Sequence, residues 1–154
     1  MSIRLKRAQL SDAETMHRMQ VAAFAPLLAK YRDTAINPAC ETIERVREKI
    51  AHSHYYFILD GTRAVGGIRV ASRPGAAGFR FISPLFIAWD QQNRGFAQQA
   101  IRAVESIHGA RGWRLDTILE EPGNCHLYVK MGYRRTGESR RIRPNMTIVD
   151  YEKE

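Results

Sequence analysis

Residues 86–97 read FIAWDQQNRGFA, an apolar segment that runs through a polar loop into the start of a helix. The first amides of a helix lack intrahelical acceptors, and the helix dipole adds positive potential there. An anion such as a phosphate is therefore the natural ligand of this junction. Gly95 and Ala97 let an oxygen atom approach the backbone, and Arg94 adds a permanent positive charge. The alternative is an ordinary loop with a glycine before a helix, which these residues taken alone also fit.

The hydrophobic pattern on both sides of this loop predicts a mixed α/β fold. Period-two alternation marks strands, and apolar residues at spacings of three and four mark helices. Ser11 and Glu14 have the spacing of a capping box, Pro26 is expected to kink or break the first helix, and Pro84 to break a strand. The expected elements are, in order, a strand over 3–8, helices over 11–30 and 41–51, strands over 55–59, 64–70 and 79–87, a helix from the loop to 108, a strand over 113–119, a helix over 124–131, and strands over 133–136 and 147–151.

Length and composition fit one globular domain over residues 1–154, and 44% of these residues are hydrophobic. We expect a central, mostly antiparallel sheet of about seven strands, flanked by about four helices. No apolar run approaches the length of a membrane span, and the N-terminus has no secretory signal, so we expect a cytoplasmic protein without a membrane partner.

Charge and cysteine content narrow the function classes further. The two cysteines, Cys40 and Cys125, lack the spacing of a disulfide framework or a zinc site, so no metal is expected. The net charge of +8 favours polyanionic partners, which include nucleic acid, an anionic membrane surface and a phosphate-rich ligand.

Two motifs resemble those of the GNAT superfamily of acyl-CoA-dependent N-acyltransferases. Residues 92–97, QNRGFA, are similar to its Q/R-x-x-G-x-G/A signature, and residues 127–133, LYVKMGY, resemble the L-Y-x-x-x-G-F/Y segment that follows it. One helix and one strand are expected between the two motifs, as in that superfamily. The order of the preceding elements also fits, so the resemblance covers essentially the whole chain.

The resemblance implies that acetyl-CoA is the co-substrate and assigns roles to individual residues. Tyr128 matches the family's tyrosine that protonates the departing CoA thiolate. The resemblance also implies that Tyr128 contacts the bound acetyl-CoA. Asn124 lies near Glu121, the position at which many relatives carry a cofactor-binding asparagine. The backbone of the strand end would bind the pantetheine arm, and the loop amides would bind the pyrophosphate. These segments comprise Phe86, Ile87 and Ala88 in the strand, and Gln92, Asn93, Arg94, Gly95, Phe96 and Ala97 in the loop.

The general base is not assigned by the resemblance. Many relatives carry a glutamate on the strand that matches residues 79–85, and this chain has no acid there. Glu120, Glu121 and His126 are the candidates that remain. Direct transfer from a thioester needs no covalent enzyme intermediate, so Cys125 is interpreted as a small buried hydrophobic residue rather than a nucleophile.

We therefore predict an N-acetyltransferase that moves an acetyl group from acetyl-CoA to a primary amine by direct attack. The acceptor, a small molecule or a peptide amine, is expected between the first two helices and the strand ends. Its wall, which carries few acids and so disfavours a polyamine, would include Phe24, Tyr31, Arg32, Tyr55 and Tyr56.

Two other functions and one assembly state stay open. One is a basic nucleic-acid-binding module that uses the arginines of 134–143, although aromatic residues that could stack on bases are sparse there. The other is a non-catalytic acyl-CoA sensor of the same fold. A homodimer is possible in each case.

Overall fold

The computed structural model describes residues 2–76 and 78–154. Its elements follow the order predicted from the sequence, with seven strands and four α-helices. The strands are β1 (Arg4–Arg7), β2 (His54–Asp60), β3 (Arg63–Ala71), β4 (Arg80–Ile87), β5 (Trp113–Ile118), β6 (Arg134–Arg143) and β7 (Met146–Lys153). The helices are α1 (Ala13–Tyr31), α2 (Ile43–His52), α3 (Phe96–His108) and α4 (Pro122–Lys130).

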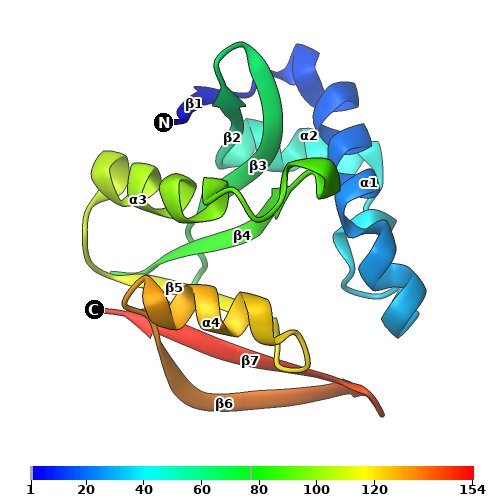
Figure 1. The fold of residues 1–154 in the computed structure, drawn as a ribbon, viewed down its shortest axis with the longest axis vertical. Helices are drawn as coiled ribbons and strands as arrows, with labels where there is room; N and C mark the ends of the chain where they lie inside the picture. The colour runs from blue at the N-terminus through cyan, green and yellow to red at the C-terminus, as the bar shows by residue number, and fades with distance from the viewer. Residues whose placement is uncertain (1, 77) are drawn as a thin grey trace.

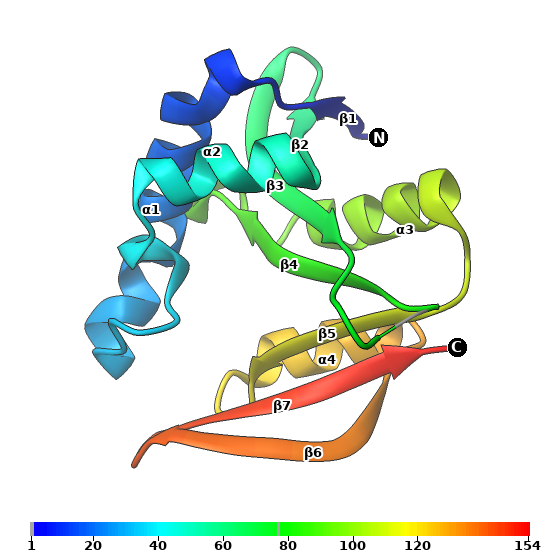
Figure 2. The same cartoon turned by 180° about the vertical axis from the view of Figure 1, so that it is seen from behind.

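All seven strands form one sheet in the order β1-β2-β3-β4-β5-β7-β6. Every neighbouring pair is antiparallel except β4 and β5, which are parallel. Helices α3 and α4 cover one face of the sheet, and α1 and α2 lie on the other (Figures 1 and 2). The predicted mixed α/β class and mostly antiparallel sheet are confirmed.

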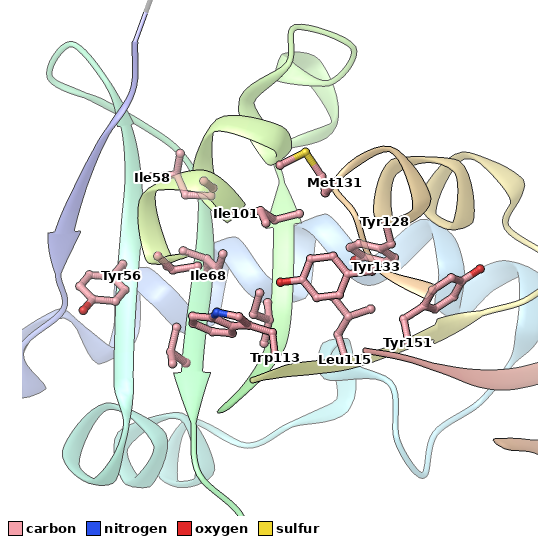
Figure 3. Close-up of a cluster of buried hydrophobic side chains, with 14 of the residues drawn as sticks. Tyr56, Ile58, Ile68, Ile101, Trp113, Leu115, Tyr128, Met131, Tyr133 and Tyr151 are labelled. Atoms are coloured by element: carbon pink, nitrogen blue, oxygen red, sulfur yellow. The ribbon is translucent and has the colours of Figure 1, made fainter. Parts of the chain in front are cut away.

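The larger core lies between the sheet and helices α3 and α4. Trp113 is fully buried there, and its indole nitrogen donates to the carbonyl of Gly109 at 2.7 Å. Burial of each large apolar side chain stabilises the fold by ~1.5–3 kcal/mol. Figure 3 shows the members of this cluster, of which those labelled are Tyr56, Ile58, Ile68, Ile101, Trp113, Leu115, Tyr128, Met131, Tyr133 and Tyr151.

Strands β4 and β5 are paired only where they begin. Their register comprises Arg80 with Trp113 and Phe81 with Arg114. Beyond these pairs the two strands separate, as Figure 1 shows, while β5 remains fully paired with β7 on its other side. The separation leaves one edge of β4 without a neighbouring strand over most of its length, and we call this opening the notch.

Four local predictions need correction. Helix α1 is preceded by a 3-10 turn over Leu10–Asp12, and the cap joins the Asp12 carboxylate to the Gln9 amide (2.8 Å), so the predicted Ser11 and Glu14 box is wrong. Helix α1 runs unbroken through Pro26 to Tyr31, whose buried ring packs against Met146 and Ile148.

Strand β4 also continues through Pro84 rather than breaking there. Ser83 and Pro84 lie opposite a single residue of β3, which makes a bulge and confirms that the strand is irregular at this point. Strand β6 extends well beyond the predicted 133–136, because its residues are exposed on both faces and show no apolar alternation. No α-helix in the described part of the chain is long and apolar enough to cross a membrane.

Candidate active site

The loop that follows β4 presents the start of α3 to the notch. Gly95 caps the helix with φ of +80°, a conformation that glycine adopts without strain. A Cβ atom added at Gly95 would meet nothing within 4 Å, so the space in front of the first helical amides is open. Asn93 also has a positive φ, +65°, which bends the loop around this space. An anion can therefore reach the helix start along the backbone.

Two polar side chains of the loop are engaged within the protein. Arg94 donates from Nη1 to the Gln91 side chain at 2.7 Å, and its guanidinium lies 5.1 Å from the centre of the Phe96 ring. Gln92 donates from Nε2 to the carbonyl of Ile87 at 3.2 Å. These contacts engage both side chains within the protein, and the first amides of α3 have no acceptor inside the helix.

The free edge of β4 carries backbone groups at alternate residues. The Ala88 amide donates to the Val65 carbonyl of β3 at 2.8 Å. Because an antiparallel strand bonds to a given neighbour at every second residue, the N–H and C=O groups of Leu85 and Ile87 point away from β3 into the notch. An extended ligand chain can pair with these groups as an added strand would.

Two cavities occupy the notch and meet inside it. The first, of about 400 Å³, lies along the β4 edge and the start of α3. The second, of about 150 Å³, lies among α1, the loop after α1, and strands β4, β5 and β7. The residues that line both are Phe24, Leu27, Leu85, Asn124 and Tyr128.

Tyr128 is held at this meeting point by the aromatic core. It is 7% exposed, and its ring centre lies 6.3 Å from that of Tyr133 and 6.0 Å from that of Tyr151. Burial raises its pKa, and the nearby charges of Asp116 and Cys125 raise it further. The hydroxyl therefore keeps its proton at neutral pH and can donate it.

The sequence profile of the acetyltransferase (GNAT) family matches residues 21–133. The chain belongs to this family. No curated protein matches its sequence. Solved structures share the fold at low identity. A PaiA N-acetyltransferase from Thermoplasma acidophilum in complex with coenzyme A has a TM-score of 0.78, 15% identity and 100% coverage of both chains.

Two further similar structures are of acetyltransferases named for their acceptors. The RimL ribosomal L7/L12 alpha-N-protein acetyltransferase, in complex with coenzyme A, has a TM-score of 0.75 at 12% identity and covers 98% of this chain and 93% of its own. A spermidine N-acetyltransferase SpeG chimera from Vibrio cholerae and hSSAT has a TM-score of 0.74 at 17% identity, and covers 99% of this chain and 96% of its own.

The first cavity of this acetyltransferase brings together most of the residues predicted to bind acetyl-CoA. Ala88 and Arg94 do not line it, because the Ala88 amide is bonded to β3 and the Arg94 side chain is bonded to Gln91. Leu85 lines it and was not singled out, although the alternation along β4 could have indicated it. The predicted residues that line the cavity are Phe86, Ile87, Gln92, Asn93, Gly95, Phe96, Ala97, Asn124 and Tyr128.

The predicted acceptor wall is largely wrong. Of its five residues only Phe24 lines a cavity of the acetyltransferase. Tyr55 is buried and donates to Gln20 at 2.6 Å, whereas the Tyr56 hydroxyl pairs with His108 on the opposite face of the sheet. Tyr31 is buried against β7, and its hydroxyl donates to Glu121.

The carboxylates of the second cavity were also missed. Asp33 and Asp116 both line this small cavity, and neither was singled out from the sequence. No local motif marks either residue, and they come from segments far apart in the sequence.

The three candidate bases named from the sequence line neither cavity. Glu120 accepts from the amide and the hydroxyl of Thr147 at 2.7 and 2.9 Å. Glu121 forms an ion pair with Lys30 at 2.7 Å, and His126 is exposed on α4. Cys125 is half-buried against the core and lines neither cavity, in line with the hydrophobic interpretation. Within residues 2–76 and 78–154, no group of His, Cys, Asp and Glu side chains has the arrangement of a metal site.

Proposed function

We propose that this acetyltransferase transfers the acetyl group of acetyl-CoA to a primary amine by direct attack. The observation that carries the proposal is that two cavities meet at Tyr128, one beside an anion-binding helix start and one beside two carboxylates. Direct transfer requires that thioester and amine meet within attack distance, and two joined cavities supply that proximity.

The donor would bind along the first cavity. The amides at the start of α3 and in residues 92–97 would bind the diphosphate of CoA, where Gly95 leaves the approach open. The N–H and C=O groups of Leu85 and the N–H group of Ile87 would pair with the pantetheine arm, whereas the Ile87 carbonyl already accepts from Gln92. One of these N–H groups would face the developing oxyanion, an interaction worth about 2.7–4 kcal/mol in other enzymes.

Tyr128 would act as the general acid toward the CoA sulfur. Its raised pKa makes the hydroxyl a weak acid in isolation. A thiolate that forms in the same buried site is also destabilised by the loss of water, so its affinity for a proton rises in parallel. The Tyr128 hydroxyl would therefore donate its proton to the CoA sulfur as the carbon–sulfur bond breaks, because the proton affinities of the two groups are then similar.

The acceptors named for similar proteins are a polyamine, spermidine, and the α-amino group of a ribosomal protein. Both are primary amines, and both fit the proposed chemistry. The nucleic-acid alternative receives less support, because Arg140 of β6 is paired with Asp116 and Asp150, and Arg134 is paired with Glu154.

Titration calorimetry and an amine screen test the proposal together. Calorimetry with acetyl-CoA should show binding, and duplex DNA at moderate salt should show none. Incubation with acetyl-CoA and a panel of primary amines should release free CoA and yield an acetylated amine by mass spectrometry. Binding of acetyl-CoA without transfer to any amine would instead support the acyl-CoA sensor.

A further inference from the structure

The second cavity identifies the groups that can handle the acceptor's protons. Among the described residues that line the two cavities, only three side chains titrate: Asp33, Asp116 and Tyr128. Strand β4 carries no acid, and Glu120 and Glu121 are bonded elsewhere. With Tyr128 assigned to the leaving sulfur, a base for the amine has to come from the two aspartates or from water.

Asp116 lies on β5, and its side chain is 33% exposed. The neighbouring residues Leu115 and Thr117 point to the opposite, buried face of the sheet. Arg140 lies 3.5 Å from the Asp116 carboxylate and 3.5 Å from that of Asp150. The two carboxylates therefore share the positive charge of Arg140, which orients Asp116.

Burial leaves Asp116 more basic than an ordinary aspartate. Burial raises the pKa of Asp116, and the charge of Asp150 adds to the rise, while Arg73 and Arg140 act against it. Asp116 in turn raises the pKa of Tyr128, and both residues line the second cavity. A carboxylate with increased proton affinity therefore faces the same cavity as the proposed acid.

Asp33 offers a second, unused acceptor in the same wall. The residue is 3% exposed, and its Oδ1 atom accepts from the amides of Ala35 (3.0 Å) and Ile36 (3.4 Å). Its Oδ2 atom is buried and has no hydrogen-bond partner in the described part of the chain. Buried polar atoms are almost always paired in native proteins, so an unpaired oxygen on a residue that lines the cavity leaves an acceptor for a ligand's donor group once the side chain turns toward it.

We propose that Asp116 takes the proton of the attacking amine and that the acceptor carries a second nitrogen donor group, which binds Asp33. This inference rests on the proposed function. The rest of the wall is mostly apolar, so the acceptor class is a small amine with an apolar middle and a second amino group. The apolar side chains of the wall are Phe24, Leu27, Ile36, Pro38, Ile82, Pro84, Leu85, Ile118, Met146 and Ile148.

Asp116 and Tyr128 together account for every proton that moves in the reaction. The amine nitrogen bonds to the carbonyl carbon of the thioester, and the carbon–sulfur bond breaks. One proton of the nitrogen passes to the Asp116 carboxylate, and the Tyr128 hydroxyl proton passes to the CoA sulfur. Proton transfer through water from Asp116 to the Tyr128 phenolate then restores both groups, so the products are the amide and the free thiol.

The test of Asp116 compares Asp116→Asn with Asp150→Asn, which removes a similar carboxylate next to Arg140 but lines neither cavity. With 1,4-diaminobutane as acceptor, we expect Asp116→Asn to lower kcat by about 10²-fold or more, the usual contribution of a general base. The dissociation constant of acetyl-CoA should not change. The loss should shrink as the pH rises, since more of the amine is then neutral, and Asp116→Glu should recover part of kcat. Asp150→Asn should change kcat far less than Asp116→Asn does, because it removes only a charge beside the base and not the base itself.

The test of Asp33 compares two acceptors. We expect Asp33→Asn to raise the KM for 1,4-diaminobutane several-fold more than the KM for butylamine, which lacks the second nitrogen, with little change in kcat. If Asp33→Asn does not fold, the wild-type preference for the diamine over butylamine serves as the second measurement.

Each failure has its own signature. Wild-type protein that binds acetyl-CoA and acetylates no amine would overturn the proposed function, and the role of Asp116 with it. An active wild type, with Asp116→Asn as active as Asp150→Asn, would overturn the role of Asp116 alone. Equal use of butylamine and the diamine by the wild type would overturn the acceptor class.

Discussion

Replacement of Tyr128 by phenylalanine removes a single oxygen atom from the point where the two cavities meet. The phenyl ring would keep its packing at 6.3 Å from Tyr133 and 6.0 Å from Tyr151, so the core and the shape of both cavities should persist. Only the proton donor for the leaving sulfur is lost. A general acid contributes typically 10²–10⁴-fold to a rate, and we expect kcat to fall by about that factor.

The expected loss in kcat exceeds any expected loss in cofactor affinity. A fall of 10²–10⁴-fold corresponds to about 2.7–5.4 kcal/mol in the activation free energy. A hydrogen bond from the Tyr128 hydroxyl to bound acetyl-CoA is worth ~0.5–1.5 kcal/mol, so the dissociation constant should change by less than about tenfold. Steady-state rates of CoA release and titration calorimetry measure the two quantities separately.

A matched control comes from the neighbouring tyrosine. Tyr133 donates to Glu105 at 2.9 Å and lines neither cavity. Tyr133→Phe should lower the free energy of unfolding by about 1 kcal/mol and leave kcat unchanged. If Tyr128→Phe lowers kcat and acetyl-CoA affinity by the same factor, or behaves as Tyr133→Phe does, Tyr128 serves packing and the assigned acid is wrong.

Three other substitutions test separate parts of the structure. Gly95→Val should abolish acetyl-CoA binding in calorimetry, because a branched side chain is strained at φ of +80° and fills the open approach to the helix start; unchanged binding would contradict this. Gly112→Ala should lower the free energy of unfolding by about 1–3 kcal/mol, since its Cβ would lie 2.4 Å from the Gly78 carbonyl at φ of +79°; an unchanged melting temperature would contradict this. Asp116→Asn should stabilise the fold at neutral pH. The raised pKa of Asp116 means that the folded state binds its proton more tightly, so the aspartate loses stability as pH rises through the range between the unfolded and folded pKa values. Urea unfolding should show this gain at neutral pH and its disappearance in acid, and a gain that persists in acid would point to another cause.

The segment proposed to bind the diphosphate through consecutive amides could be located from the sequence, because its residues are neighbours along the chain as well as in space. Residues 92–97 form such a segment, and the structure places Gly95 at the helix start with the positive φ that a glycine allows. The order of strands and helices was predictable for the same reason, since each element is marked by its own periodicity. The start of α1 was mistaken by a few residues because a 3-10 turn precedes it and moves the cap to Gln9 and Asp12.

The acceptor side depends on contacts that no local pattern encodes. Asp33 follows α1 and Asp116 lies in β5, and only the separation of β4 from β5 brings both to one cavity. One error was avoidable from strand geometry alone. Tyr55 and Tyr56 are adjacent in β2, so their side chains must point to opposite faces of the sheet and cannot line the same wall.

The notch itself has an identifiable cause at each end of β4. At its start, β4 and β5 are drawn together by the bond from the Arg80 amide to the Gly112 carbonyl at 2.7 Å, at a place so tight that a Cβ on Gly112 would meet the Gly78 carbonyl. Farther along, the bulge at Ser83 and Pro84 bends β4, and no pairing with β5 follows it.

The two ends together explain why a binding site lies here. Unpaired strand edges normally cost stability or invite aggregation, and proteins usually cover them. Here helix α1 crosses the opening and limits access, while the polar groups of Leu85 and Ile87 remain directed into the first cavity. A ligand with amide groups of its own can complete this edge, whereas β5 cannot reach it. This stretch of the β4 edge is where we propose that the pantetheine arm binds, and Pro84 lies beyond the last residues of β4 that pair with β5.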